Sequence, residues 1–222
     1  MITALHQVFG RKSGSKILDL PFQNNFTDTT GINTMIAGGT SNLPTFVLDG
    51  TEYAAVFNGS QSLKTNANFN IGTDKVSISF WLKSSVTTRG LIAEISNNPD
   101  TNNVFSVEIN KGSTNFNAMS RNTGFNERRY ANTYDGSWNH YVIIIDRSLN
   151  ATDEIKLYKN NSFVTSTLSS STDNNGIFGA YQLFIGQRDG STTGFNGQLK
   201  FLKIFNYPLS QTEITNLYNK TM

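Results

Sequence analysis

Short stretches in which apolar and polar residues alternate run through almost the whole chain of 222 residues. Residues 76–83 are the clearest, with four apolar side chains predicted on one face of a strand. Such stretches recur at spacings of about 8–12 residues, with Gly, Asn and Asp between them. No helical period begins before residue 211. The pattern predicts an all-β fold, a two-sheet antiparallel β-sandwich with one short C-terminal helix.

The individual strands are predicted from these stretches and from the turns between them. Asp49-Gly50 is a hairpin signal, Asn160-Asn161 joins a second hairpin, and residues 23–39 are predicted to be a polar loop. Strands are expected at residues 16–22, 46–48, 54–57, 76–83, 91–96, 104–110, 115–121, 128–133, 138–146, 154–159, 162–167, 183–186 and 199–205.

The last strand and the helix are the best specified part of the chain. In residues 199–205 a period of two predicts Leu199 and Phe201 on one face. Ser210 is a good N-cap, and Glu213 three residues later completes a capping box. Leu209 before the cap and Ile214 in the helix predict a hydrophobic staple.

Composition excludes several classes of protein. The chain has no cysteine, which excludes a disulfide framework, a thiolate zinc site and a cysteine nucleophile. The net charge is +2 with 15% charged residues, which is not typical of a nucleic-acid-binding protein. No segment approaches the roughly 18 apolar residues of a membrane span. We expect one domain at residues 16–222, preceded by an arm or edge strand at residues 1–15.

The order of several short motifs resembles the concanavalin A-like lectin/glucanase superfamily, and within it the jelly-roll domains of the LamG (laminin-G, pentraxin-like) type. Each motif is weak alone, but the ordered set covers about residues 17–219. The resemblance implies a jelly-roll sandwich. The matching residues are Pro21, Phe22, Asn25, Asp28, Gly31, Ala55, Phe57, Gly59, Ser79, Trp81, Lys83, Trp138, His140, Leu157, Tyr158, Asn160, Gly197, Leu199, Leu202, Ile204, Phe205, Asn206, Leu209, Ser210, Glu213, Ile214, Leu217 and Tyr218.

One departure from the family pattern concerns calcium. Lys200 and Phe201 stand where the family often has two acidic residues. Calcium binds several oxygen atoms, usually with carboxylates among them, so Lys200 weakens the expectation of a calcium site. Asp28 remains a candidate ligand, and the alternative is that it caps a turn. No other cofactor is predicted.

Glycoside hydrolysis is one activity that the fold family suggests. A retaining glycosidase needs two carboxylates about 5–5.5 Å apart. The family's E-x-D-x-x-E run is absent, and Glu94, Glu108 and Glu127 each stand alone on a predicted strand. Two carboxylates from different strands can still meet. His140 shares a strand face with Trp138 and is interpreted as a structural histidine rather than a general base. The chain is therefore predicted not to be an enzyme.

Three predicted loops carry the residue types that recognise sugars, namely amides, charged planar groups and aromatic rings. Which of these loops share one end of the sandwich does not follow without the strand register. The candidate ligand-binding residues are Asn97, Asn98, Asp100, Phe125, Asn126, Arg128, Tyr130, Arg188 and Asp189.

The leading interpretation is a non-catalytic recognition module that binds carbohydrate or a protein surface and acts in adhesion. Display on a virion or surface appendage for host attachment is compatible with it, with residues 1–15 contacting other proteins of that assembly. The alternatives are a structural virion or assembly protein and, third, a glycoside hydrolase. No signal peptide is recognised, so an extracellular or virion location is an expectation only. A homo-oligomer is compatible with the sequence, and membrane insertion and nucleic-acid binding are not expected.

Overall fold

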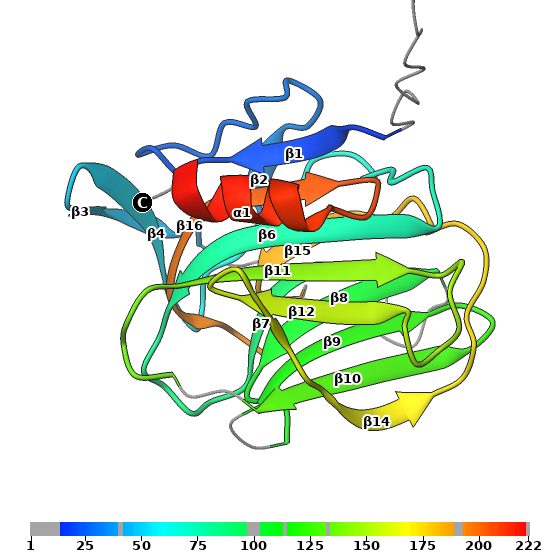
Figure 1. The fold of residues 1–222 in the computed structure, drawn as a ribbon. Coiled ribbons are helices and arrows are strands. Elements are labelled where there is room, and N and C mark those ends of the chain that lie inside the picture. The colour runs from blue at the N-terminus through cyan, green and yellow to red at the C-terminus, as the bar shows by residue number, and fades with distance from the viewer. Residues whose placement is uncertain are drawn as a thin grey trace, which may run out of the picture.

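The computed structural model describes residues 14–39, 42–96, 103–112, 115–131, 134–188 and 193–220. Two antiparallel sheets of eight strands pack face to face, as predicted, and one helix lies over the outside of the first sheet (Figure 1). The predicted arm at residues 1–15 lies outside the described residues except for its last two positions.

The first sheet contains the strands nearest the helix. β1 pairs with β16, and the other seven strands follow the order β13-β12-β11-β6-β16-β4-β3. Their bounds are β1 Lys16–Leu20, β3 Thr45–Asp49, β4 Glu52–Asn58, β6 Lys75–Lys83, β11 Asn139–Asp146, β12 Ile155–Lys159, β13 Ser162–Val164 and β16 Asn196–Phe205.

The second sheet follows the order β14-β10-β9-β8-β7-β15-β5-β2. Its central strands are consecutive in the sequence and are joined as hairpins. The bounds are β2 Met35–Ala37, β5 Leu63–Thr65, β7 Gly90–Ile95, β8 Val104–Ile109, β9 Asn115–Arg121, β10 Phe125–Ala131, β14 Thr167–Ser171 and β15 Leu183–Gly186.

The apolar side chains that alternate along the strands fill the space between the sheets. Val76, Ile78, Phe80 and Leu82 of β6 all lie in this core, as their period of two predicts. Phe116 of the second sheet stacks on Tyr141 of the first, with ring centroids 4.9 Å apart. The two sheets therefore share one core.

Three predicted boundaries were wrong in detail. The predicted polar loop at residues 23–39 contains the short strand β2, whose three residues are only half-buried. The strand predicted at residues 128–133 begins earlier, at Phe125, because it pairs with β9 along its whole length. The strand predicted at residues 162–167 divides into β13 and β14, which belong to different sheets.

A bulge in β16 changes the predicted alternation of residues 199–205. The register shifts between Lys200 and Lys203, and Phe201 has a φ of 51°. The extra residue places Leu199 and Leu202 both in the core, whereas strict alternation predicted Leu199 with Phe201.

Helix α1 (Gln211–Lys220) forms as its sequence predicts. The Ser210 hydroxyl donates to Glu213 Oε2 over 2.7 Å, and the backbone N–H of Ser210 donates to the same oxygen over 2.8 Å. Leu209 and Ile214 are buried in one apolar cluster with Val142, Ile144 and Phe205. The helix thus covers the outer face of the first sheet.

Candidate functional site

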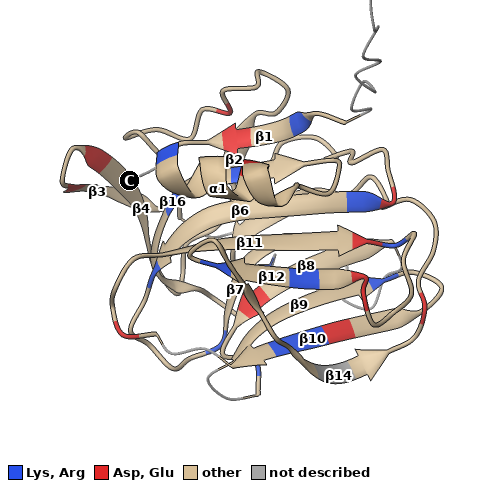
Figure 2. Ribbon diagram, in the orientation of Figure 1, with Lys and Arg blue, Asp and Glu red and all other residues tan. Residues whose placement is uncertain are grey.

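The outer face of the second sheet carries three buried glutamates on neighbouring strands. Residues directly opposite each other in an antiparallel pair point to the same face. Glu94 of β7 lies opposite Ser106, and Glu108 of β8 lies opposite Asn117. Glu127 of β10 belongs to the same face through its neighbours on β9. We call the surface formed by Glu94, Glu108, Glu127, Asn117 and Arg129, with Arg89, Lys111 and Arg188 reaching onto it, the charged face. Figure 2 shows acidic and basic residues side by side on β10.

Arg188, just after β15, connects two of these glutamates. Its Nε donates to Glu94 Oε1 over 2.7 Å, and its Nη2 donates to Glu94 Oε2. The same Nη2 lies 3.8 Å from Glu108 Oε1. Burial raises the pKa of Glu94 and outweighs the opposing effect of Arg188. The bidentate contact fixes both planar groups in one orientation.

The other cations hold Glu108 and Glu127. Arg89 Nε donates to Glu108 Oε2 over 2.5 Å. Lys111 Nζ and Asn117 Nδ2 each lie 2.9 Å from Glu127 Oε1, and Arg129 Nε lies 3.8 Å from it. Each glutamate therefore has a basic partner. The carboxylates, guanidinium groups and amide of this face are held in place by these contacts.

Some polar atoms of this surface have no partner within the part of the chain that the structure describes. Asn117 is 2% exposed, and its Oδ1 accepts no hydrogen bond there. The buried hydroxyl of Ser96, just beyond β7, has none either. Unsatisfied polar atoms are costly in a protein interior, so their presence beside fixed charges is consistent with a surface that meets another polar molecule.

Two of the residues predicted to bind a ligand, Arg188 and Phe125, lie on the side of the second sheet that carries the charged face. The Arg121 guanidinium lies 4.9 Å from the centre of the Phe125 ring. Four other candidates, Asn97, Asn98, Asp100 and Asp189, lie outside the described residues.

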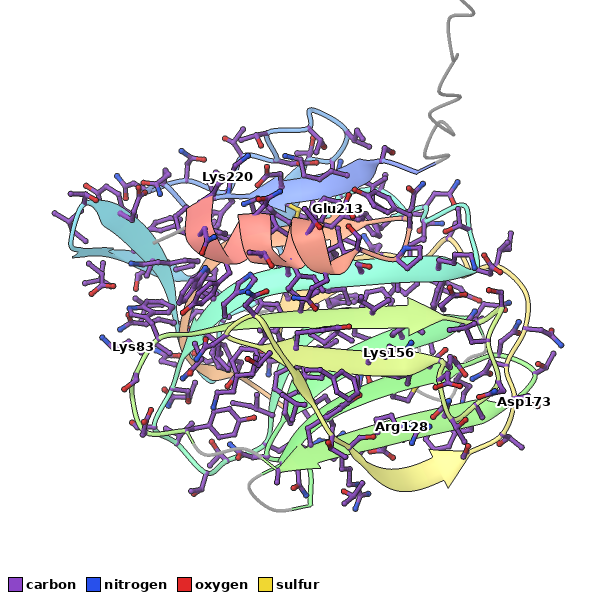
Figure 3. The ribbon with its side chains drawn as sticks, in the orientation of Figure 1. Lys83, Arg128, Lys156, Asp173, Glu213 and Lys220 are labelled. Carbon is purple, nitrogen blue, oxygen red and sulfur yellow. The ribbon has the colours of Figure 1, made fainter. Side chains whose placement is uncertain are left out.

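The remaining candidates, Asn126, Arg128 and Tyr130, point to the inner side of β10. Asn126 Nδ2 donates to Ala151 O over 2.7 Å and Arg128 Nη2 to the same oxygen over 2.6 Å. Tyr130 is 1% exposed and its hydroxyl donates to Ile155 O over 3.2 Å. Arg128 and Asp173, which come from separate segments, are labelled in Figure 3, and both hydrogen-bond to Ala151. These contacts hold the loop before β12 in place.

The sequence did not predict Glu94, Glu108, Glu127 and Asn117 as one site. They come from four strands, and each strand contributes one of them. Only the register of β7, β8, β9 and β10 brings them to the same face.

Asp28 caps the loop after β1, and its carboxylate does not fit a calcium ion. Oδ1 accepts the backbone N–H groups of Asp19 and Thr30, and Oδ2 accepts the Thr30 hydroxyl, the Asn33 N–H and the Asn33 amide, all within 2.7–3.0 Å. Burial raises the pKa of Asp28, but these hydrogen bonds outweigh burial and lower it overall. Five donors fill the roughly four lone-pair positions of a carboxylate.

The ammonium group of Lys200 binds the oxygen atoms of Asp49, where a calcium ion would otherwise find ligands. Its ammonium donates to Asp49 Oδ2 over 2.7 Å and to Asp49 O over 3.2 Å. It also lies 4.7 Å from the centre of the Trp138 ring, and Trp138 Nε1 donates to Asp49 Oδ2 over 2.6 Å. The described residues hold no cluster of three or more metal-ligating side chains.

His140 lies beneath the helix and not in a site. Its ring packs against Trp81 and Tyr218, with centroids 5.3 and 5.9 Å away, and its Nε2 lies 2.9 Å from the Ser79 hydroxyl. Burial lowers the pKa of His140 to about 4, and Lys203 adds to this effect. The ring has the surroundings of a structural histidine.

Comparison with known families gives one match. A family model described as the concanavalin A-like lectin/glucanases superfamily matches residues 57–215. No curated protein sequence matches the chain. Within the described part, no helix has the length and apolar character needed to cross a membrane.

Several solved structures share the fold at low sequence identity. Domain 4 of AbnA, a GH43 extracellular arabinanase from Geobacillus stearothermophilus solved with arabinotriose, is 19% identical, with a TM-score of 0.70 over 92% of this chain and 98% of that domain. The binding domain of Paraclostridial Mosquitocidal Protein 1 is 15% identical, with a TM-score of 0.69 over 92% of this chain and 52% of that one. The binding domain of botulinum neurotoxin DC in complex with SialylT is 17% identical, with a TM-score of 0.67 over 94% of this chain. The match spans 52% of that neurotoxin domain.

Proposed function

The chain belongs to the concanavalin A-like lectin/glucanase superfamily, and from this premise we propose that it is a non-catalytic module that binds carbohydrate on its charged face. The observation that carries the proposal is the row of fixed planar groups on β7, β8, β9 and β10. Carboxylates, guanidinium groups and an amide present donors and acceptors in fixed directions, which suits the paired hydroxyl groups of a sugar ring.

The charged face is pre-organised, which favours binding. Glu94 and Arg188 hold each other through two hydrogen bonds, and Glu127 is held by Lys111 and Asn117. Side chains that are already ordered lose little conformational entropy when a ligand binds. Phe125 adds an aromatic ring at one end of the same side of the sheet.

The structural neighbours support the proposal by analogy. The arabinanase domain was solved with arabinotriose, and one botulinum binding domain was solved with SialylT. The binding domain of the same neurotoxin, DC, was also solved with rat synaptotagmin II, so a protein surface is the competing class of partner. The polar face of this chain favours the sugar, because protein interfaces are usually apolar at their centre.

Glycoside hydrolysis is the second candidate, and one observation favours it. Glu94 and Glu108 come together at Arg188, and burial raises the pKa of Glu94 as a general acid requires. Against this, both oxygens of Glu94 accept hydrogen bonds from Arg188. A carboxylate held in this way is poorly placed to donate a proton, so binding without catalysis is the better supported function.

The test is a glycan array probed with the wild-type chain and with Arg89→Met. The Arg89 side chain is 41% exposed, so its replacement removes a cation from the charged face without opening a cavity in the core, and thermal unfolding verifies that the variant is folded. Lys156→Met is the matched control, because Lys156 lies on β12 of the other sheet. We expect glycan binding by the wild type and the control, a loss of at least about tenfold in Arg89→Met, and no hydrolysis of the bound glycan.

An array without a single bound glycan would refute the proposal. Hydrolysis that disappears in Glu94→Gln or Glu108→Gln would favour the enzyme instead. Display on a virion or appendage stays a prediction, because it depends on residues 1–15, which lie almost entirely outside the described residues.

A further inference from the structure

A small cavity lies on the first sheet, away from the charged face, where β6 ends and β16 begins. Its volume is about 220 Å³, and β4, β6, β16 and the segment at residues 84–86 contribute to its walls. Lys83 and Val56 both lie opposite Gln198 in the ladder, so the three side chains form one row across the outer face of the sheet. Lys83 and Gln198 supply the polar groups of that row.

Two polar groups of this row, Gln198 Oε1 and the Lys83 ammonium, make no hydrogen bond or ion pair with a described residue. Gln198 Oε1 is buried and accepts no hydrogen bond within the described part of the chain. The Lys83 ammonium makes no hydrogen bond or ion pair with a described residue, and its nearest recorded partner is the Trp138 ring, 5.8 Å from the centroid. An acceptor and a cation therefore lie side by side.

Hydrogen bonds to backbone carbonyl groups hold the walls of the cavity in place. The Ser84 hydroxyl donates to Asn196 O over 2.9 Å, and the Gly136 N–H donates to Ser84 O over 2.9 Å. A Cβ at Gly197 would lie 2.6 Å from Lys83 O, so glycine allows β16 to approach β6 at this point. Trp138 is held by its hydrogen bond to Asp49, which leaves its ring beside Lys83.

The geometry points to a second ligand site in this cavity, for a single acidic sugar such as a hexuronic acid. The carboxylate of the ligand binds the Lys83 ammonium, and a hydroxyl group donates to Gln198 Oε1. The aliphatic face of the sugar ring packs beside Val56. The volume is below the roughly 300–1,000 Å³ of drug-sized pockets, which limits the ligand to about one ring.

The charge around the cavity favours an anion. Lys83 and Lys200 both approach the Trp138 ring, and Asp49 is the acid that lies between Lys200 and Trp138. Because Asp49 is already bound by Lys200 and Trp138, Lys83 is the cation that remains for a ligand. A neutral hexose offers hydroxyl groups but nothing to pair with this charge.

The experiment is a titration of the whole chain with glucuronic acid and, separately, with glucose, followed by NMR chemical shifts. Four variants are compared with the wild type: Lys83→Met, Gln198→Met, the half-buried lysine control Lys156→Met and the charged-face variant Arg89→Met. Figure 3 labels Lys83 and Lys156, which lie on different strands of the first sheet. Thermal unfolding of each variant confirms that it is folded.

We expect glucuronic acid to bind the wild type at least tenfold more tightly than glucose. Lys83→Met should weaken the binding of glucuronic acid about tenfold and Gln198→Met about threefold, while Lys156→Met leaves it unchanged. Equal affinities for the two sugars, or equal behaviour of Lys83→Met and Lys156→Met, would overturn the inference. A loss in Arg89→Met alone would place the ligand on the charged face instead and would leave the proposed function standing.

Discussion

The two sheets have outer faces of opposite character. On the first sheet the helix covers the outer face: Tyr218 stacks on Trp81 with ring centroids 5.7 Å apart, and Ile214 is fully buried. On the second sheet the outer face is lined by acidic and basic side chains in ion pairs. Where the helix covers it, the first face is stabilised by apolar packing. The second is stabilised by charge pairs, which are also groups that recognise polar molecules.

Removal of Arg188 is expected to have the largest effect. Arg188→Met leaves Glu94, which is 0% exposed, without its bidentate partner, and breaking a buried pair in this way costs about 3–5 kcal/mol. Urea unfolding at pH 7 measures the loss. The double variant with Glu94→Gln should recover part of it, because no charge is then buried alone.

The stability lost in Arg188→Met should be recovered as the pH is lowered. Without Arg188 the pKa of Glu94 rises further, so the folded state binds a proton at a higher pH than the unfolded chain does. The destabilisation is then smallest below the unfolded pKa of about 4.3 and grows as pH rises through the folded value. A loss below about 1 kcal/mol at pH 7, or a loss independent of pH, would show that the charges of this face are not structural.

Ile214→Ala tests the face covered by the helix. The side chain is fully buried among Val142, Ile144 and Leu209, and its truncation leaves a cavity that costs about 2–5 kcal/mol. Exposed Thr212→Ala on the same helix is the control and should change stability by less than about 0.5 kcal/mol. Glycan affinity should be unchanged in Ile214→Ala at a temperature where it is folded. A loss of affinity equal to that of Arg89→Met would mean that the two faces are not separate in function.

Because His140 is buried beneath the helix, the stability of the folded protein should depend on acid. Burial lowers its folded pKa to about 4, whereas the unfolded chain takes up the proton near 6.5. Stability is therefore lost as pH falls from about 6.5 to 4, by at most about 3 kcal/mol. His140→Gln should flatten the dependence of unfolding free energy on pH in that window, as measured by urea unfolding. Parallel curves for the two proteins would exclude a buried neutral histidine.

The fold was predictable because its signals are local. The alternation in β6, the hairpin at Asp49-Gly50 and the Ser210–Glu213 capping box each depend on residues within one element. Local patterns of this kind agree with one another along the chain, and that agreement identifies a sandwich. The same patterns predicted that Leu209 and Ile214 pack together at the helix start.

The charged face was not predictable because it depends on the pairing of strands. Period-two alternation places Asn126, Arg128 and Tyr130 on one face of β10 and Glu127 on the other, but it does not say which face looks inward. The loop around Ala151 decides this, since its carbonyl takes the polar groups of Asn126 and Arg128. The bulge at Phe201 was hidden for a similar reason, because it is defined by the register of β16 against β6.

Calcium is expected to leave the stability of the protein unchanged, and this is the smallest effect that we predict. A calcium ion bound only to the folded state at 100 times its Kd would raise stability by about 2.7 kcal/mol. The carboxylate of Asp28 is filled by five hydrogen bonds, and Lys200 holds Asp49. Melting curves in EDTA and in millimolar calcium should therefore coincide. A melting temperature that falls in EDTA, together with loss of that response in Asp28→Asn, would mean that a metal ion displaces these donors. The comparison would then change, because the sandwich would rely on a bound ion as well as on its helix and its charge pairs.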